Sequence, residues 1–173
     1  RLKANFEAGA EKFADHGAFL KSLDMRLKIA VNNPGLIARA AQLCQKTNQF
    51  NLTLHRYTAS ELSAMIDSGK AFVFLGSLSD RFGDHGWTIM AILERESKRD
   101  GWKIDNMLMS CRVLGRDVEQ VFLQSCLDYV SRIERLPVQG TFEQGPKNKM
   151  VSDFFARVGF AEVPGSGDGR REF

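Results

Sequence analysis

Three apolar runs in the middle of the chain constrain the fold more strongly than any other feature of the sequence. They occupy residues 71–77, 87–93 and 102–114, and each has the aromatic and β-branched content of a β-strand. The connections at 80–86 and 97–101 are rich in Asp and Gly, which is typical of hairpin links between antiparallel neighbours. We therefore expect an antiparallel sheet at the centre of the fold.

Helix and strand patterns alternate on either side of this sheet. Apolar and charged residues alternate over 24–30, as in a half-buried strand, and Asn33-Pro34 marks the start of a helix. Thr58 and Glu61 form a capping box that opens a second helix. The later segments predict a helix at 116–134, a strand at 138–142, a helix at 147–158 and a last strand at 160–163. The expected fold class is α/β, or α+β, with a central mixed and largely antiparallel sheet flanked by helices.

The chain is long enough for one packed domain. At 173 residues, folding buries roughly 70% of the surface that the unfolded chain exposes. We expect residues 1–20 to be a linker or leading helix from a missing N-terminal domain, because the chain opens on Arg1 rather than Met. Residues 21–164 form the expected domain, and the glycine-rich residues 165–173 are predicted to be a flexible tail.

The composition excludes several classes of protein. The 24 basic and 21 acidic residues alternate along the chain and give a net charge of only +3, so we expect no nucleic-acid partner. No apolar run approaches the roughly 20 residues that span a bilayer, so we expect no membrane association. Cys44, Cys111 and Cys126 form no CxxC pair, which argues against a disulfide framework or a metal site and favours a reducing cytoplasm.

The third apolar run leads into a turn that suits an anion. Residues 112–117 precede a long helix, so backbone amides of the turn point outward at a helix N-terminus. The segment resembles the signature with which GNAT acyltransferases hold the pyrophosphate of coenzyme A or a phosphopantetheine arm. That resemblance implies a GNAT-like fold, with phosphate contacts from Arg112, Gly115 and Arg116. Asp117 stands where the signature has a small residue, and the alternative is that Asp117 caps the helix while Gly115 only makes the turn.

A second segment resembles the late motif of the same family. Asn148 corresponds to the Asn that lines the coenzyme side, and Gly159-Phe160 ends the following helix. Phe155 stands where many members have a tyrosine that protonates the leaving thiolate. Phenylalanine has no such proton, so the general acid usual in the family is missing.

Three runs, in this order and spacing, make the resemblance more specific. They are 45–51, 80–86 and 110–116, and they closely resemble the C-terminal half of FkbH-like proteins over about residues 19–160. The resemblance implies a preceding haloacid-dehalogenase-type phosphatase domain and transfer of a glyceryl-type unit to an acyl carrier protein in polyketide-type biosynthesis. No Asp-x-Asp motif occurs in this chain, so the phosphatase step and its Mg²⁺ belong to the missing domain.

The first two runs also hold residues suited to binding. Gln45, Thr47, Asn48 and Asn51 supply neutral donors and acceptors, and we expect them, with Asp80, to contact the substrate. The alternative is a polar helix end followed by a turn.

His85 lies in the second run beside Asp84. An imidazole can accept a proton near neutral pH, so we expect His85 and Asp84 to contribute to catalysis. The alternative is a solvated turn.

Cys111 is the candidate nucleophile. It follows a strand, precedes a helix N-terminus and lies beside Arg112, a setting that favours the reactive thiolate and a thioester relay. Strand alternation instead places Cys111 on the face of Met107 and Met109, where it would be a buried and inert thiol.

The leading hypothesis is an acyltransferase that uses the phosphopantetheine arm of an acyl carrier protein, or coenzyme A, as its cofactor. One alternative is a non-catalytic docking module with the same fold, which presents the carrier protein to the phosphatase domain. Asp117 and Phe155 favour that module, since each removes a feature of a working GNAT site. The other alternative is a coenzyme A-dependent N-acetyltransferase.

Overall fold

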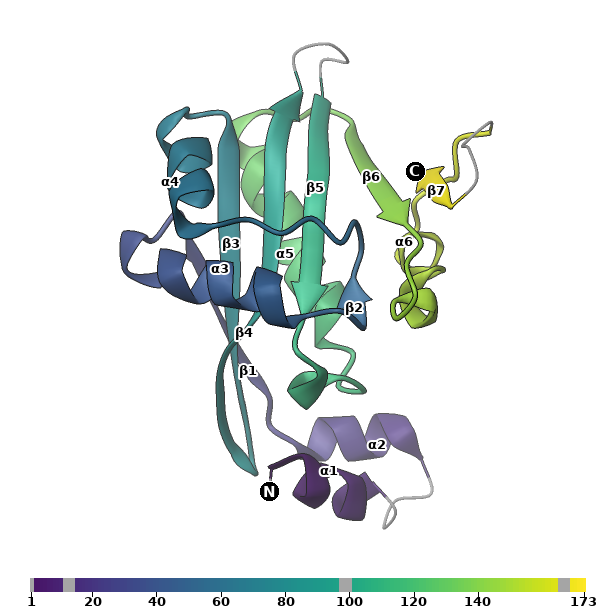
Figure 1. The fold of residues 1–173 in the computed structure, drawn as a ribbon. Helices are drawn as coiled ribbons and strands as arrows, with labels where there is room; N and C mark the ends of the chain where they lie inside the picture. Colours follow the sequence, from purple (N-terminus) through teal and green to yellow (C-terminus); the bar gives the residue numbers. More distant parts are fainter. Residues whose placement is uncertain (1, 11–14, 97–100, 165–168) are drawn as a thin grey trace.

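Strand pairing dominates the structure, a computed structural model that describes residues 2–10, 15–96, 101–164 and 169–173. Seven strands of these residues form the sheet, in the order β1-β3-β4-β5-β6-β7, and β2 pairs with β5 beside that path (Figure 1). The strands are β1 (Arg26–Val31), β2 (Phe50–Asn51), β3 (Ala71–Asp80), β4 (Gly83–Glu96), β5 (Gly101–Met109), β6 (Val138–Glu143) and β7 (Arg170–Glu172). Among the described strands, only β5 and β6 pair in parallel.

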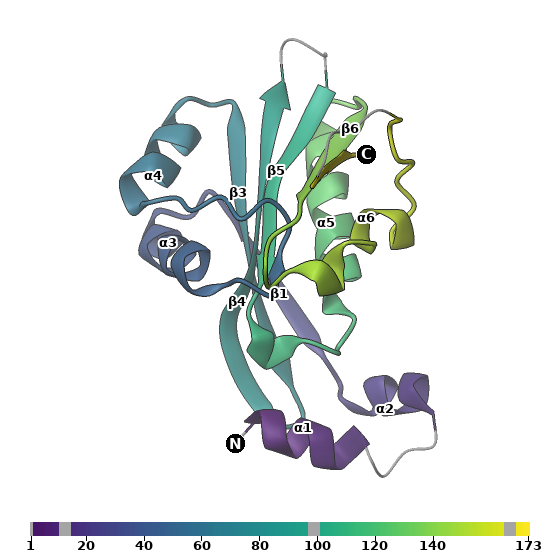
Figure 2. The ribbon, with the colours of Figure 1, turned by 45° about the vertical axis from the view of Figure 1, so that its right-hand side comes forward.

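Helices cover both faces of this sheet. They are α1 (Leu2–Ala10), α2 (His16–Ser22), α3 (Ile37–Lys46), α4 (Ala59–Asp67), α5 (Val118–Ile133) and α6 (Phe154–Arg157), with short 3₁₀ turns η1 (Pro34–Leu36), η2 (Cys111–Val113) and η3 (Lys149–Val151). α3 and α4 lie on one face, α5 and α6 on the other, and α1 and α2 lie beyond one end of the sheet (Figure 2). A search of the described helices for one with the length and apolar character of a membrane span finds none.

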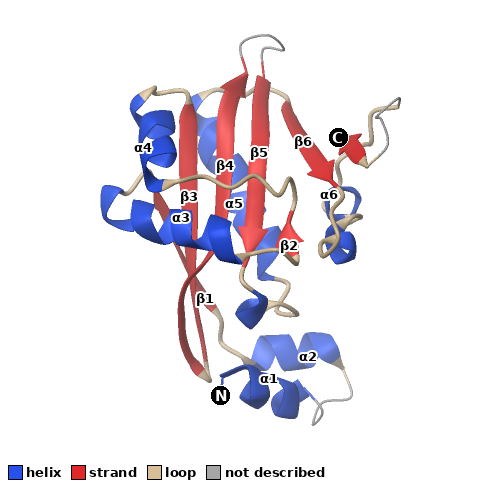
Figure 3. Ribbon diagram, viewed as in Figure 1, coloured by secondary structure: helices blue, strands red, loops and turns tan. Residues whose placement is uncertain are grey.

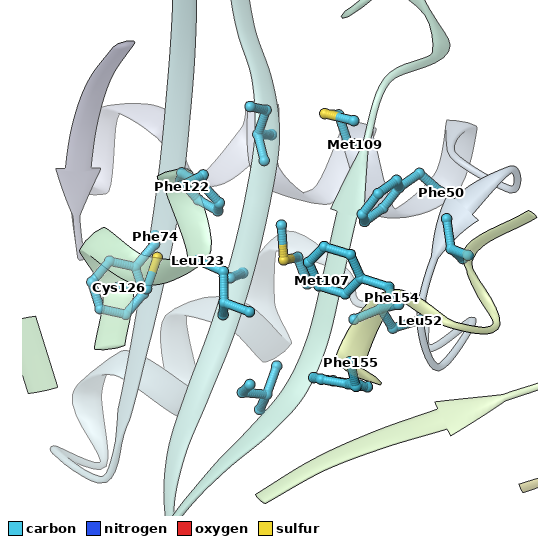
Figure 4. Close-up of a cluster of buried hydrophobic side chains, with 14 of the residues drawn as sticks. Phe50, Leu52, Phe74, Met107, Met109, Phe122, Leu123, Cys126, Phe154 and Phe155 are labelled. Atoms are coloured by element: carbon cyan, nitrogen blue, oxygen red, sulfur yellow. The ribbon is translucent and has the colours of Figure 1, made fainter. Parts of the chain in front are cut away.

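Two apolar cores join these layers. The larger core packs Phe122 of α5 and Phe154 of α6 against sheet residues such as Met107 (Figure 4). The smaller core lies on the opposite face and contains Leu43 of α3 and Leu62 of α4. Full burial of each such side chain stabilises the fold by about 1.5–3 kcal/mol, so the sheet is held from both sides.

The seam between β5 and β6 is the irregular part of the sheet. These two strands pair only over 102–104 with 138–140, and β6 then turns away from β5 (Figure 1). β2 fills the space that opens, because it pairs with the end of β5 while the Glu143 amide donates to the Leu52 carbonyl at 2.8 Å. We refer to this junction of β2, β5 and β6 as the seam.

The predicted fold class is confirmed. The sheet is mixed and largely antiparallel, and the strand expected at 24–30, the runs at 71–77 and 87–93 and residues 102–109 of the third run belong to it. The capping box also forms, since the Thr58 hydroxyl accepts from the Glu61 amide at 3.3 Å and the Glu61 carboxylate accepts from the Thr58 amide at 2.7 Å.

The prediction of a loop at 80–86 is wrong. β3 and β4 continue through this segment, and only Arg81 and Phe82 form the turn between them. The pairing passes through two register shifts, which are β-bulges. Gly and Asp occur at bulges and tight turns as well as in loops, so their abundance here did not identify a loop.

Two predictions near the C-terminus are also wrong. The helix expected at 147–158 is broken into η3 and α6, and no strand forms at 160–163 (Figure 3). The last strand is β7, within the tail that was expected to be flexible, and Phe173 beside it is only 5% exposed. β6 offers β7 a free edge for backbone hydrogen bonds, which the glycine content of the tail could not indicate. Residues 165–168 of that tail lie outside the described residues.

Candidate functional site

A groove opens where α3, the end of β5 and the loop after β6 meet, with a volume of about 640 Å³. The residues that line it are Arg39, Gln42, Leu43, Lys46, Thr47, Asn48, Gln49, Met109, Ser110, Cys111, Arg112 and Lys147. Two predicted substrate contacts, Thr47 and Asn48, therefore share one site with the candidate nucleophile Cys111 and the candidate phosphate ligand Arg112.

Positive charge distinguishes this groove. Arg39, Lys46, Arg112 and Lys147 line it, and no lining residue that the structure describes is Asp, Glu or His. Burial, and then repulsion by Arg112, lowers the pKa of Arg39, so the two guanidinium groups lie within electrostatic range of each other. Within the described chain, none of these four cations forms an ion pair with a carboxylate. Such a set of cations suits a phosphate or carboxylate ligand.

Three of the four cations were not predicted as site residues. Arg39 and Lys46 lie two helical turns apart on α3, so their spacing places them on one face and could have indicated a shared site. The Trp87 carbonyl holds the Arg39 side chain in place, because it accepts from the Arg39 Nε at 2.9 Å and from the Arg39 Nη2 at 2.7 Å. Lys147 comes from a loop that only folding brings to α3, and no local pattern reveals it.

Cys111 is exposed, so the alternative of a buried thiol at this position is wrong. β5 ends at Met109 rather than at 114, and strand alternation therefore stops before Cys111. Ser110 then caps η2, which begins with Cys111. Burial raises the pKa of the thiols of Cys44 and Cys126, which lie in the two cores as predicted.

His85, Asp80 and Arg116 do not line the groove and form a buried cluster of their own behind Arg112, whose carbonyl accepts from the Arg116 Nη1 at 3.2 Å. The Asp80 Oδ2 is 2.9 Å from the His85 Nε2 and accepts from the Arg116 Nε at 3.0 Å. The exposed fractions of the side chains are 0% for Asp80 and 1% for each partner. Burial alone would raise the pKa of Asp80, but the hydrogen bonds from His85 and Arg116 outweigh it and lower that pKa. We call these three residues the buried ion cluster.

The sequence predicted His85 as a base, Asp80 as a substrate contact and Arg116 as a phosphate ligand. The structure instead places all three side chains in the buried ion cluster. His85 is the extra residue of a β-bulge between β3 and β4, since Asp84 and Gly86 on either side of it are the ones that pair. The bulge turns the imidazole toward Asp80. Asp84 does not meet His85, because its carboxylate is exposed and accepts from the Gly86 amide at 2.7 Å.

The turn before α5 is covered by the N-terminal helix. Gly115 has a φ of 79°, and the Phe6 ring of α1 lies 3.6 Å from the position of a Cβ there. The same ring stacks on the Arg116 guanidinium at 4.1 Å. Asp117 is the N-cap residue of α5, as the alternative interpretation expected, but its side chain forms no capping hydrogen bond.

Asn51 and Asn148 lie in the seam rather than in the groove. The Asn148 side chain donates to the carbonyls of Asn51 and Glu143 at 2.8 Å each. The Asn51 side chain donates to the Thr47 carbonyl at 3.1 Å and both asparagines are fully buried. They therefore position the loop behind the groove. Gln45 is exposed and does not line the groove.

The strand order and the seam can be compared with known proteins. The sequence matches no protein-family model and no curated protein. A mutant of the spermidine N-acetyltransferase SpeG from Vibrio cholerae matches with a TM-score of 0.58 and 15% identity, covering 85% of this chain and 92% of that one. An acetyltransferase of the GNAT family from Listeria monocytogenes matches at 0.59 and 13%, covering 84% and 92%. The chain has the GNAT fold.

The ribosomal-protein-S18-alanine N-acetyltransferase from Escherichia coli gives a similar result, with a TM-score of 0.60 and 12% identity over 85% of this chain and 89% of that one. These matches confirm the GNAT-like fold that residues 112–117 and 148–160 predicted. At such identities they carry the fold alone, and the more specific resemblance to FkbH-like proteins stays a prediction.

Proposed function

We propose that this domain transfers an acyl group between a thioester and the thiol of a phosphopantetheine arm, and that the groove binds the phosphate of the arm. The observation that carries the proposal is the set of four cations, Arg39, Lys46, Arg112 and Lys147, with no carboxylate among the described residues that line the groove. The fold supports acyl transfer, because the structural neighbours named above are acetyltransferases.

The carrier and the acyl unit are proposed from the sequence. The runs 45–51, 80–86 and 110–116 resemble FkbH-like proteins, which favours an acyl carrier protein as the partner and a glyceryl-type unit as the acyl group. A haloacid-dehalogenase-type domain before this one would supply that unit and hold the Mg²⁺. Coenzyme A carries the same phosphopantetheine chemistry, so an N-acetyltransferase that uses it would bind the same groove.

A docking module is the second candidate. The groove contains no base among its described lining residues, and Phe155, where the family has its general acid, is buried at 1% exposure (Figure 4). The Phe155 ring also packs directly against Gly140, where it leaves no room for a Cβ, so it is a tight packing element of the core. A domain of this kind would bind the carrier without transferring the acyl group.

Calorimetric titration tests the phosphate site. Coenzyme A and phosphopantetheine should bind, and pantetheine should bind at least about tenfold more weakly, since a charge-assisted hydrogen bond contributes about 1.5–3 kcal/mol. The double variant Arg112→Ala/Lys147→Ala should lose this preference. Lys28→Ala removes an exposed cation of β1 and should keep it. Equal affinity of the wild-type domain for all three ligands would contradict the proposal.

Intact-protein mass spectrometry separates the enzyme from the docking module. The domain is incubated with phosphopantetheinylated carrier protein and a glyceryl-thioester mimic, and the wild type is expected to load the carrier. If Cys111→Ala abolishes both the adduct on the domain and the loading, the Cys111 thiol is a covalent relay. Loading that survives in Cys111→Ala indicates direct transfer, and carrier binding without any loading indicates a docking module.

A further inference from the structure

A second group of ionisable side chains lies outside the groove, around residues for which the sequence predicts no role. The Asp105 carboxylate of β5 is its centre: Oδ2 accepts from the Tyr57 hydroxyl at 2.5 Å, and Oδ1 lies 3.5 Å from the His55 Nδ1 and 3.6 Å from the Lys103 Nζ. On the far side of the ring, the His55 Nε2 is 3.9 Å from the Glu143 Oε1. The imidazole is thus held between two carboxylates, with 41% of its side chain exposed.

A β-bulge places Asp105 in this group. Ile104 and Asn106 each have a partner on β4, and Asp105 between them has none. A bulge of this kind redirects the side chain of the extra residue. Asp105 is consequently buried beneath the connection from β2 to α4, which crosses β5 in Figure 1.

That connection is fixed over Asp105 by its own hydrogen bonds. The Thr53 hydroxyl donates to the Asp105 carbonyl at 3.0 Å, and the Asn106 side chain donates to the His55 carbonyl at 3.2 Å. Leu54 between them has a φ of 60°, a left-handed conformation that is costly for leucine and persists only where its surroundings impose it. The backbone that carries His55 is therefore held in place before any ligand binds.

Tyr57 determines which nitrogen of the imidazole is basic. Burial, and then its hydrogen bond to Asp105, raises the pKa of Tyr57, so the phenol remains a donor to that carboxylate. The second carboxylate oxygen faces the His55 Nδ1 and stabilises a proton there. The Tyr57 oxygen, 3.3 Å from the His55 Nδ1, can accept from that nitrogen as well. With its proton on Nδ1, the imidazole presents Nε2 as the acceptor, and the Glu143 Oε1, 3.9 Å from Nε2, lies beyond hydrogen-bond distance.

The groove and the His55 group complement each other. The described lining of the groove has cations and a thiol but no base, whereas His55 is a base beside two carboxylates. Both lie on the face covered by α3 and α4, because Tyr57 packs into the smaller core and α3 lines the groove. Asp105 and Cys111 are at most about 20 Å apart along β5, a span that an extended phosphopantetheine arm covers.

We propose that His55 is the general base for the acyl acceptor, which the carrier partner of the proposed function makes a thiol, with Asp105 and Tyr57 as positioning residues. The inference rests on the proposed function, in which an arm with its phosphate in the groove brings its sulfur atom to His55. Nε2 takes the proton of the acceptor S–H, and the resulting thiolate attacks the thioester carbonyl carbon. The new C–S bond forms, the old one breaks, and the leaving thiolate takes the proton back from Nε2. Acyl group and proton exchange places between two sulfurs, so no further reactant is needed.

Two acceptors test this role with an acyl-coenzyme A donor. N-acetylcysteamine is a thiol that is mostly protonated at neutral pH and needs a base, whereas hydroxylamine attacks thioesters as a neutral amine. His55→Gln should lower transfer to the thiol about 100-fold and leave transfer to hydroxylamine nearly unchanged. Asp105→Asn should reduce the thiol reaction selectively as well. His16→Gln removes an exposed histidine of α2 and should affect neither reaction.

The outcomes separate this inference from the proposed function. A wild-type domain that acylates neither acceptor would overturn both. If the wild type acylates both acceptors and His55→Gln is equally active with the thiol, only the inference about His55 fails. Equal losses toward both acceptors would give His55 a structural role and would also overturn the inference.

Discussion

Arg112 and Arg116 lie four residues apart in the sequence, and the molecule uses them in opposite ways. Arg112 is exposed, lines the groove and has no carboxylate partner among the described residues, whereas Arg116 is 1% exposed and bonded to Asp80 at 3.0 Å. A buried charge requires a partner, because leaving it uncompensated is costly, while an exposed cation requires none. The presence of a carboxylate partner therefore distinguishes a structural arginine from one that is available to a ligand, even when both belong to one motif.

Removal of Asp80 should have the largest effect. Asp80→Ala leaves Arg116 and His85 buried without an anion, and we expect the free energy of unfolding to fall by about 3–5 kcal/mol. Urea denaturation measures this loss. Asp84→Ala, an exposed position in the same hairpin, should cost less than about 1 kcal/mol. Similar values for the two variants would show that the buried ion cluster does not stabilise the fold.

Charge reversal in the groove should weaken ligand binding and leave stability almost unchanged. Lys46→Glu/Lys147→Glu is expected to weaken coenzyme A binding about 100-fold, or roughly 2.7 kcal/mol. Both lysines are exposed, so the unfolding free energy should change by no more than about 0.5 kcal/mol. Titration and denaturation of the same sample check both values. If the double variant lost stability but kept its affinity for coenzyme A, the groove cations would be structural charges rather than ligand contacts.

Lowering the pH should reduce the contribution of the buried ion cluster to stability. The lowered pKa of Asp80 in the fold means that its stabilisation is present above the unfolded value of about 3.9 and is lost as the pH falls through the folded value. As the pH falls below about 5, the wild type should therefore lose more stability than Asp80→Asn, which has no carboxylate to protonate. Parallel stability curves for the two proteins would contradict the assignment.

Thiol labelling tests the smallest of these expected effects. Cys111 is exposed, whereas Cys44 and Cys126 are fully buried. Iodoacetamide should therefore modify one cysteine in the native protein and three in urea, with peptide mass spectrometry identifying Cys111 as the native site. Coenzyme A should slow this modification by occupying the groove. Labelling of Cys111 at the same rate with saturating coenzyme A would place the ligand elsewhere.

The sheet was accessible from the sequence because its signals are local. The runs at 71–77 and 87–93 and the capping box at Thr58 each carry their pattern within a few residues, and all three were predicted correctly. The segment 80–86 was misread because Asp, Gly and His serve bulges and loops alike. The break between η3 and α6 follows from the packing of Phe154 and Phe155 in the core rather than from helix periodicity.

The candidate site was predicted only in part, for the same reason. Asn48, Cys111 and Arg112 belong to motifs that are continuous in the sequence. Lys147 reaches the groove from a distant loop, and His55 acquires its carboxylates only through tertiary contacts with β5 and β6. No window of the sequence places these groups together.

The seam joins parts of the chain that are far apart, since the hydrogen bond from Asn148 to the Asn51 carbonyl spans 97 residues. Contacts of such separation form slowly, because the chain must close a long loop before the contact contributes any stability. We therefore expect the seam to assemble late in folding and its amides to exchange with solvent before those of β3 and β4. Asn48 and His55 flank β2 in the sequence, so groove and base would be completed together with the seam. A chain that is still folding would then have no assembled site with which to consume a thioester.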